Sequence, residues 1–386
     1  MKWKFYSLAF VAGMSILTAC SSDDNGNGGN GNGNEIENGT ILKGTITSDV
    51  TLAAGNTYKL SGEYIVEEGA TLHIEEGVKI IAVYDDIADY ILVKQGGKIN
   101  AVGTPDKPIV MTSEKEEPGA WGGIHICGRA HTNAEGGKGS SEIGGAVYGG
   151  NDDADNSGTL QYIRLEYTGF AFDEEHEANG ISFYGVGNGT IVDHCQAYKG
   201  SDDGFEFFGG SVNVSNLVAV SCSDDSFDWT EGWNGKGTNL VAYQEDKSTL
   251  GYDCDCLMEC DNNGSNNAAT PVAHPVLKNL ILVGNGGSKQ GIRLRAGTEV
   301  EIDNAKVCGK GQPLTVETAL TENALKNGTS KLTNITLTSE LSSKEGIYTH
   351  ADFIAVTSNK VDANLSYSSF EDIRKECSWM NGSWVK

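Results

Sequence analysis

Basic residues are scarce in this chain, and their scarcity limits the partners that it can have. The 386 residues include 28 Lys and Arg against 53 Asp and Glu, so the formal net charge is −25 at pH 7. Nucleic-acid binding requires a basic face that neutralises phosphates, and we therefore expect no nucleic-acid partner. The acidic balance instead favours solubility and the binding of cations.

Long apolar runs and long helical patterns are also missing. Beyond residue 17 no apolar run reaches the ~18 residues that suggest a membrane span. A helical pattern of about 12 or more residues is hard to find. The best candidate covers residues 316–325, which we expect to be an excursion from the main fold. The sequence contains neither Gly-x-Ser-x-Gly nor His-Glu-x-x-His, which excludes the hydrolases that depend on these motifs.

The first residues are typical of a targeting segment. Lys2 and Lys4 precede an apolar stretch, residues 5–17. The stretch ends in Leu17-Thr18-Ala19-Cys20, which resembles the lipobox of bacterial lipoproteins. The resemblance implies that residues 1–19 are a lipoprotein signal peptide and that Cys20 is acylated. An ordinary signal peptide with a chance Cys is the alternative.

The residues after Cys20 suggest where the protein is anchored. Ser21-Ser22-Asp23-Asp24 is similar to the acidic export signal that sends some lipoproteins to the outer leaflet of the outer membrane. We expect a lipid-anchored outer-membrane protein that faces the cell exterior, with a periplasm-facing anchor as the alternative. Residues 25–39 are a low-complexity Gly and Asn segment, so residues 20–40 form the acylated Cys and a flexible tether. The folded domain covers residues 41–386.

Glycine is abundant, at 51 residues, and short β-patterned runs recur with a period in the low twenties. Such a period is the signature of a solenoid. One series marks a fixed turn position at which Asn tolerates a left-handed backbone and can stack its amide from rung to rung. Its members are Tyr162, His194, Asn216, Asn239, Asn279, Asn304 and Asn334.

The N-terminal part shows the rung most plainly. Thr71-Leu72-His73-Ile74 recurs in pattern 27 residues later, and Leu72 and Ile74 alternate with polar residues, so they face inward. Glu-Glu-Gly repeats after only eight residues, which is the length of one short strand and a turn. Three such units make a rung. The predicted fold is therefore all-β: a single-stranded parallel β-helix with three short strands per rung, closed by a C-terminal cap in residues 367–386.

The whole pattern resembles the right-handed parallel β-helices of the pectin lyase-like superfamily. Trp121-Gly122-Gly123-Ile124 and Glu259-Cys260-Asp261-Asn262-Asn263 resemble β-helical surface lipoproteins, a likeness that carries no chemistry. A narrower resemblance, over about residues 177–222, is to pectate lyases of polysaccharide lyase family 9.

Aligning the rungs on apolar–x–apolar triplets predicts a column of charged side chains on the outer surface. Its members are Ser182, Glu206, Asp228, Glu259 and Arg293, one from each rung. Neighbouring rungs are about 4.8 Å apart, and carboxylates at that spacing repel by on the order of 1 kcal/mol per pair in water-like surroundings. A cation, a retained proton or Arg293 must relieve this repulsion.

Acidic turns precede two of these triplets. Ser201-Asp202-Asp203 and Ser223-Asp224-Asp225 repeat at an interval of 22 residues. Such residues often accept backbone hydrogen bonds and are then purely structural. The alternative is a Ca²⁺ site, since calcium takes 6–8 oxygen ligands. The resemblance to the lyases implies Asp202, Asp203 and Glu206 as its ligands, with Asn179 in place of the Asp of that family.

The likeness to the lyases fails where catalysis needs it. Ser182, Phe183 and Tyr184 stand where these enzymes carry a lysine base, and Lys199 lies on another segment. Without a base, β-elimination lacks its central step. A glycoside hydrolase that uses Glu206 and Asp228 remains open, because adjacent rungs place their carboxyl groups roughly 5 Å apart.

Other residues extend or limit these interpretations. Trp229 and Trp233 are candidates for stacking on sugar rings, and the acidic run 173–177 is expected at the lip of the same surface. Eight cysteines remain after Cys20, an even number in a compartment that permits disulfides, although their pairing stays open. Cys254, Cys256 and Cys260 lack a zinc-finger spacing and are predicted to form disulfides. Cys195 is predicted to be a buried thiol.

Taken together, the residues favour a cell-surface lipoprotein whose β-helix presents an acidic face and acts as a non-catalytic binding module. We expect its ligand to be a glycan or a partner outer-membrane protein, with calcium as the one cofactor in question. A polysaccharide hydrolase or lyase that uses the stacked carboxylates is one alternative. A structural subunit of an outer-membrane complex is another.

Overall fold

Parallel β-strands account for most of the folded chain. The computed structural model describes residues 34–85, 87–172, 177–287 and 289–386. In these ranges 25 strands belong to one sheet, and its pairings are parallel throughout. The predicted signal peptide, Cys20 and most of the predicted tether lie outside the described residues.

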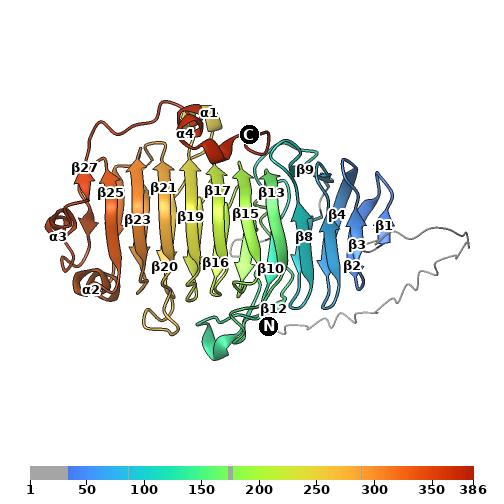
Figure 1. Ribbon diagram of the computed structural model, residues 1–386, viewed down its shortest axis with the longest axis horizontal. Coiled ribbons are helices and arrows are strands. Elements are labelled where there is room, and N and C mark those ends of the chain that lie inside the picture. Colours follow the sequence, from blue (N-terminus) through green and yellow to red (C-terminus); the bar gives the residue numbers. More distant parts are fainter. Residues whose placement is uncertain (1–33, 86, 173–176, 288) are drawn as a thin grey trace, which may run out of the picture. The chain divides into compact units, whose positions relative to one another are not determined.

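The sheet winds around a single apolar core, and its strands stack rung upon rung (Figure 1). The first rungs are built from β1 (Asn34–Ile36), β2 (Ile41–Ile46), β3 (Val50–Leu52), β4 (Thr57–Val66), β5 (Thr71–Ile74), β6 (Lys79–Ala82), β7 (Tyr90–Val93), β8 (Lys98–Val102) and β9 (Ile109–Ser113). Strand β5 pairs with β8 in the predicted register, Thr71 beside Lys98. Leu72 and Ile74 are buried as expected.

Each later rung contributes one short strand and one long strand. The short strands pair in the order β10 (Ile124–Cys127), β14 (Ile181–Tyr184), β16 (Phe205–Phe208), β18 (Phe227–Thr230), β20 (Met258–Asp261), β22 (Gln290–Arg295), β24 (Gln312–Val316) and β26 (Ser342–Ser343). The long strands pair in the order β13 (Gly158–Glu166), β15 (Ile191–Tyr198), β17 (Asn213–Val220), β19 (Lys236–Tyr243), β21 (Val276–Val283), β23 (Glu301–Cys308), β25 (Lys331–Leu337) and β27 (Lys360–Val361).

A corner divides each of the long strands β13 to β25 into two sides. All seven residues of the predicted turn series have a left-handed backbone, with φ between 52° at Tyr162 and 61° at Asn304. The strand pairing skips these positions, for example between Ser215 and Leu217. With the short strand, every rung therefore has three sides. The predicted fold class, an all-β parallel β-helix with three strands per rung, is confirmed.

Side-chain amides stack at this corner as predicted. We call Asn216, Asn239, Asn279 and Asn304 the amide ladder. The Nδ2 of each later member donates to the Oδ1 of the member before it, at 2.8, 3.0 and 2.8 Å. Before the ladder, the rings of Tyr162 and His194 stack with their centroids 4.4 Å apart. The residues that adopt the left-handed backbone at this corner are thus linked from rung to rung by their side chains.

Loops and helices interrupt the coil at its turns. The loop 128–157 carries the hairpin β11 (Gly139–Ser140) and β12 (Val147–Tyr148) and the turn η1 (Glu135–Gly137), and a second loop covers residues 262–275. The helices are α1 (Lys247–Leu250), α2 (Ala319–Asn327), α3 (His350–Ala355) and α4 (Phe370–Glu376). Helix α2 is the excursion predicted near residues 316–325. None of the described helices combines the length and the apolar composition needed to cross a membrane.

The C-terminal segment does not close the open end of the coil, contrary to the prediction. Helix α4 and the turn η2 (Ser378–Met380) pack instead along the long strands (Figure 1). Trp384 is fully buried there against outward-facing residues such as Val218 and Ile281. The reason is that these outward positions are apolar and need a cover. At the last rungs, Phe353 of α3 joins the core.

The cysteines also differ from the prediction. All eight cysteines among the described residues are free thiols and all are buried. The expected disulfides of Cys254, Cys256 and Cys260 are therefore absent, because Cys260 faces the core while Cys256 lies in a turn. Cys195 is buried, as predicted.

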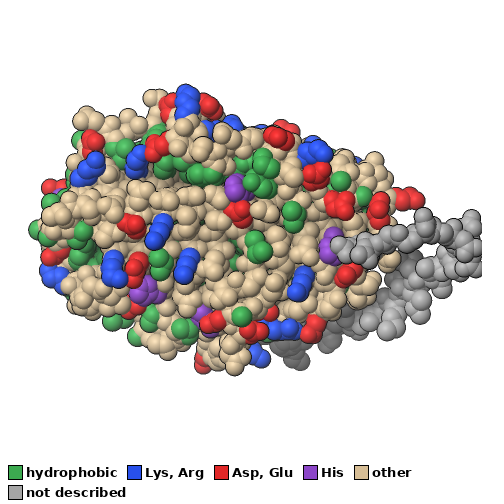
Figure 2. All heavy atoms as spheres, viewed as in Figure 1, with side chains coloured by type: hydrophobic (Ala, Val, Ile, Leu, Met, Phe, Trp, Pro, Cys, Tyr) green, Lys and Arg blue, Asp and Glu red, His purple; other side chains and the backbone are tan. Residues whose placement is uncertain are grey.

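The face built by the long strands carries mixed charges. Figure 2 shows basic and acidic side chains interspersed over this face. A denser group of acidic side chains lies beside the short strands.

Candidate functional site

The predicted column of charged side chains exists in the predicted order. The strand pairing places Ser182 beside Glu206, Glu206 beside Asp228, Asp228 beside Glu259, and Glu259 beside Arg293. The flanking apolar residues of every triplet are buried in the core. The insertion in the step from Asp228 to Glu259 does not disturb the register, because the additional residues, which include helix α1, lie outside the strands.

The turns before these strands stack in the same way and add further acidic residues. Asp202, Asp224 and Asp255 occupy equivalent places in three consecutive turns, and Asp203 and Asp225 follow the first two of them. Each turn is fixed to the next by a carboxylate. Asp203 Oδ1 accepts the backbone N–H of Asp225 at 2.8 Å, and Asp225 Oδ1 accepts that of Cys256 at 2.6 Å. The structural interpretation of the turn acids is therefore correct for one oxygen of Asp203 and one oxygen of Asp225.

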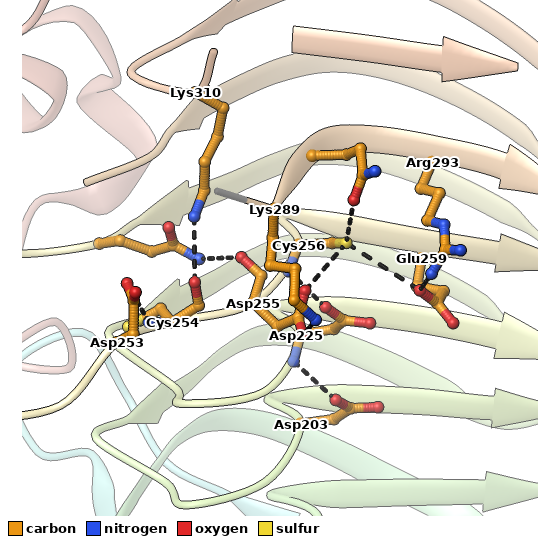
Figure 3. A network of polar contacts seen from close by, with 12 residues as sticks. Asp203, Asp225, Asp253, Cys254, Asp255, Cys256, Glu259, Lys289, Arg293 and Lys310 are labelled. Carbon is orange, nitrogen blue, oxygen red and sulfur yellow. Dashed lines mark hydrogen bonds and ion pairs between the residues drawn. The ribbon is translucent and has the colours of Figure 1, made fainter. Parts of the chain in front are cut away.

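Together the column and the turns line a cavity of about 430 Å³, which we call the acidic cavity. Ten carboxylates and two cations surround it: Glu142, Glu177, Asp202, Asp203, Glu206, Asp224, Asp225, Asp228, Asp255, Glu259, Lys289 and Arg293. Figure 3 shows part of this network, with Asp203, Asp225 and Glu259 on successive rungs. Of the predicted acidic run 173–177, Glu177 lines the cavity and the other residues lie outside the described ones.

The two cations neutralise only one end of the cavity. Arg293 binds Glu259 at 2.9 Å and also Glu317, at 3.2 Å. Arg295 binds the second oxygen of Glu259, at 2.5 Å. Lys289 forms an ion pair with Asp255. We call the acidic side chains of one turn and the strand after it an acidic row. The third row, Asp255 and Glu259, is thus compensated, as the predicted role of Arg293 requires.

The two rows before it are not compensated. Six of the lining carboxylates, among the residues that the structure describes, form no ion pair with Lys, Arg or His: Asp202, Asp203, Glu206, Asp224, Asp225 and Asp228. They are closely spaced, since ligand oxygens of Asp203, Glu206 and Asp228 lie within 4.8 Å of one another. The same spacing holds for Asp202, Asp203 and Asp224.

Two buried oxygen atoms in this part of the cavity lack a hydrogen-bond partner. Asn179, with an exposed fraction of 1%, donates from Nδ2 to Glu206 Oε2 at 2.6 Å, and its Oδ1 has no partner. Asp228 Oδ1 is likewise buried and without a partner. A buried acceptor without a partner costs about 1–3 kcal/mol, so both atoms indicate that a positively charged or donating group belongs here.

Burial and mutual repulsion raise the pKa of every one of the six carboxyls. Burial, followed by the neighbouring Asp224, raises the pKa of Asp202 to about 8. Burial and Asp255 raise the pKa of Asp224 to about 6. Burial and neighbouring carboxylates also hold the pKa of the other four well above the ordinary range, and Asp228 is the neighbour that raises the pKa of Glu206 most. At neutral pH the cavity must therefore retain protons or take up a cation.

The predicted calcium ligands all belong to this uncompensated part. Asp202, Asp203, Glu206 and Asn179 come from two adjacent rungs, and their oxygens are of the type that Ca²⁺ prefers. The sequence singled out the Asp224-Asp225 repeat without assigning it a role, and Asp228 lies close enough to complete the ligand set. The donor set therefore fits a hard divalent cation.

The predicted sugar-stacking residues do not belong to the site. Trp229 and Trp233 are each 1% exposed and lie inside the coil, where Trp233 stacks on Phe207 with a centroid distance of 4.1 Å. The prediction is wrong because Trp229 is a flanking residue of its triplet and must face inward. An aromatic residue that the sequence pattern did not single out is Phe172, which is 40% exposed. It follows Ala171, whose backbone pairs with Glu177 of the cavity.

Comparison with known proteins places the chain in a family. Residues 44–385 match the model of a family described as a pectate-lyase-like β-helix domain. No curated protein and no solved structure matches the chain. Because the match covers nearly all of the described coil, the chain belongs to the family of pectate-lyase-like β-helix domains.

Proposed function

We propose that this chain is a cell-surface lipoprotein that acts as a non-catalytic binding module. In this proposal the acidic cavity holds a divalent cation, calcium, and presents it to a glycan or a partner protein. The lipid on Cys20 and the tether in residues 20–40 would hold the β-helix at the outer face of the outer membrane.

The observation that carries the proposal is the uncompensated pair of acidic rows. Six carboxylates face one cavity with no ion-pair partner among the described residues, and the buried oxygens of Asn179 and Asp228 accept no hydrogen bond. A calcium ion would supply the missing positive charge and would take 6–8 oxygens from carboxylates, amides and water. A bound cation would also leave coordination positions for hydroxyl or carboxylate oxygens of a ligand.

The cations of the cavity do not favour a lyase. A lysine or arginine base must lose its proton near the working pH. The ion pair with Asp255 raises the pKa of Lys289, and the contacts with Glu317 and Glu259 raise that of Arg293, so both keep their protons. Lys199 lies outside the cavity and forms an ion pair with Glu245, at 2.8 Å.

A retaining glycoside hydrolase is the second candidate, and one observation favours it. Oxygens of Glu206 and Asp228 lie within 4.8 Å of each other, close to the separation of ≈ 5–5.5 Å in retaining enzymes. Such an enzyme needs one carboxylic acid and one ionised nucleophile. Here burial and repulsion raise the pKa of both carboxyls, which supplies the acid but not the nucleophile.

Calcium titration of the purified full-length chain tests the proposal. Added Ca²⁺ at about 100 times its Kd should raise the free energy of unfolding by about 2.7 kcal/mol, and chelator should reverse this. Asp203→Asn should remove the effect, because Asp203 belongs to both closely spaced clusters of carboxylates. One cluster contains Glu206 and Asp228, and the other contains Asp202 and Asp224. Glu340→Gln, an exposed acidic residue outside the cavity, is the matched control and should leave the effect intact. An unchanged stability with calcium would overturn the proposed cation site.

Product analysis separates the two candidates. The chain is incubated with neutral and uronate polysaccharides, and new reducing ends or unsaturated products are measured. Turnover that is lost in Glu206→Gln would establish the enzyme and refute the binding module. Retention of a polysaccharide without turnover, or co-purification with an outer-membrane protein, would support the binding module.

A further inference from the structure

A second cavity of about 700 Å³ lies at the edge of the coil where strand β18 ends. We call it the Asn-lined cavity. Its wall includes Asn133, Glu135, Thr230, Glu231, Asn263 and Asn266. The loops 128–157 and 262–275, which supply most of this wall, emerge at the same edge of the coil (Figure 1). The volume falls within the range of ≈ 300–1,000 Å³ that is usual for small-molecule sites.

Glu231 adopts a backbone conformation that its position in the coil normally gives to glycine. The residues at the equivalent turn of the two preceding rungs are Gly185 and Gly209, with φ of 57° and 65°. Glu231 has φ of 53°. A side chain with a Cβ is strained there, so a glutamate at this turn has a conformational cost that glycine would avoid.

The carboxylate of Glu231 is held by only one of its oxygens. Oε2 accepts the hydroxyl of Tyr148 at 2.8 Å and that of Thr132 at 2.7 Å, and both donors belong to the loop 128–157. Oε1 accepts no hydrogen bond from any described residue. The carboxylate is therefore oriented by the loop and retains one oxygen for a ligand.

A network of buried amides fixes the two loops to each other. Asn133 is 8% exposed, and its Nδ2 donates to Asn262 Oδ1 at 2.8 Å and to the carbonyl of Pro271 at 3.0 Å. Asn263 Nδ2 donates in return to Asn133 Oδ1, at 2.9 Å. The wall of the cavity is thus preorganised, so binding a ligand costs less conformational entropy.

The chemistry of the wall selects a hydroxyl-rich neutral ligand. No lining residue is a Lys, an Arg or an aromatic residue, which disfavours phosphates, carboxylates and flat apolar molecules. Amides and hydroxyls both donate and accept, while the two glutamates accept only. Adjacent hydroxyl groups of a sugar ring can satisfy such a mixture.

We propose that the Asn-lined cavity binds a sugar unit of a neutral glycan, and that Glu231 Oε1 accepts its hydroxyl groups. Strand β18 contributes to the linings of both cavities, with Thr230 in the Asn-lined cavity and Asp228 in the acidic cavity. Asp228 and Thr230 point to the same side of β18 two residues apart, so their Cα atoms are about 7 Å from each other. Binding here does not require the proposed cation.

Calorimetric titration of the full-length chain tests this site, with cellohexaose, xylohexaose, mannohexaose and maltohexaose as probes and chelator present throughout. We expect at least one probe to bind. Glu231→Gln keeps a side-chain oxygen for Tyr148 and Thr132 but removes the charge, and it should weaken binding about tenfold or more, the loss expected for one charged hydrogen bond. Glu340→Gln should bind as the unaltered chain does.

A second variant guards against an effect of Glu231 on folding. Ser265 is exposed at the wall, so Ser265→Trp should leave the thermal transition unchanged while it fills the cavity and abolishes binding. Asp203→Asn, which removes the proposed cation site, should still bind the sugar. Binding of none of the four probes, or binding that neither Glu231→Gln nor Ser265→Trp weakens, would overturn the inference. Binding that Asp203→Asn abolishes, or that appears only when calcium replaces the chelator, would place the ligand in the acidic cavity and would also overturn the inference.

Discussion

At the scale of single residues, Asp228 stands at the centre of the uncompensated acid. It faces Glu206 on one side and Glu259 on the other, and its buried Oδ1 has no hydrogen-bond partner. Arg293 and Arg295 form ion pairs with Glu259 but none with Asp228. In the metal-free protein Asp228 therefore lowers the free energy of unfolding, and a bound cation would remove this destabilisation.

Replacing Asp228 tests this cost directly. In chelator at pH 8, Asp228→Asn should raise the free energy of unfolding by about 1–3 kcal/mol, because it removes a repulsion worth about 1 kcal/mol or more for each neighbouring carboxylate. With calcium the order should invert, and the unaltered chain should be the more stable one. Urea denaturation with and without calcium measures both differences. A variant that is less stable than the unaltered chain in chelator would contradict the assignment.

Residue positions were predictable wherever alternation alone decides them. The inward and outward sides of Phe205-Glu206-Phe207 and of its neighbours followed from the period of a strand, which is why the acidic column could be placed. The same rule, applied to Trp229, contradicts its proposed contact with sugars. Glu231 could not be identified, because its two hydroxyl partners come from a loop whose path no local pattern encodes.

At the scale of elements, the amide ladder fixes the corner of the long strands. Asn279 has φ of 60°, donates a hydrogen bond to Asn239 and accepts one from Asn304. Asn is suited to both tasks, since it tolerates the left-handed region and both donates and accepts.

Two substitutions of Asn279 separate these tasks. Asn279→Gly loses the ladder hydrogen bonds but accepts the backbone, so it should cost about 1–2 kcal/mol of stability. Asn279→Ala loses the same bonds and adds the strain of a Cβ, so it should cost about 1 kcal/mol more than the glycine variant. Urea denaturation of both variants gives the comparison. Equal stabilities would show that the backbone conformation imposes no cost.

The C-terminal segment contributes through a second apolar surface on the outside of the long strands. Trp384 is fully buried in it, although its Nε1 has no hydrogen-bond partner. Trp384→Ala should therefore cost about 3–5 kcal/mol, as expected for a large buried aromatic residue. Trp384→Phe should cost less, because it keeps a ring and removes the unsatisfied donor. Thermal and urea denaturation measure both, and a cost below about 1 kcal/mol for the alanine variant would contradict this packing.

The packing of the C-terminal segment could be predicted from the sequence only in part. The apolar residues Val218, Val241 and Ile281 all occupy outward positions, which was a readable sign that something covers them. The sign does not say which segment provides the cover. The apolar and aromatic residues Cys377, Trp379 and Trp384 suit a cap at the open end equally well, and only three-dimensional packing decides between the two places.

At the scale of the whole molecule, the acidic cavity makes stability depend on pH. The folded state holds the pKa of Asp202 at about 8, against an ordinary value of 3.8. Between about pH 4 and pH 8 the folded protein therefore binds more protons than the unfolded chain, so its stability falls as the pH rises.

A denaturation series from pH 5 to pH 8 tests this dependence. In chelator the free energy of unfolding should decrease steadily over the series, and calcium should flatten the decrease because it favours the ionised carboxylates. Asp203→Asn should flatten it without calcium. Stability that rises with pH in chelator would show that folding does not raise the pKa of these carboxyls.

The proposed attachment to the membrane would depend on Cys20, which lies outside the described part of the chain. Cys20→Ala should move the protein from the membrane fraction to the soluble fraction of cells that express the full chain. Residues 41–386 should fold as before, since the described rungs are built from residue 34 onward. Fractionation and immunoblotting measure the change. A variant that remains with the membrane would contradict a lipid anchor at this cysteine.

The fold itself was the most predictable property, because every rung repeats the same pattern of inward, outward and corner residues. Seven corner residues and five stacked triplets pointed to the same coil, and the family match over residues 44–385 agrees with it. The repeat could not reveal the sites between loops. The Asn-lined cavity depends on two insertions of unrelated sequence that meet at one edge.

The return of the chain end onto its own middle has a consequence for how the molecule comes apart. A stack of repeats can fray from either tip, because each unit touches only its neighbours. Here the backbone N–H of Lys386 donates a hydrogen bond to Gln196, and Arg164 donates one to the carbonyl of Ser383, so the chain end is bound to rungs far back in the sequence. The same C-terminal segment also packs on β23. This strap couples distant rungs, so we expect them to melt in one cooperative transition rather than unzip in sequence.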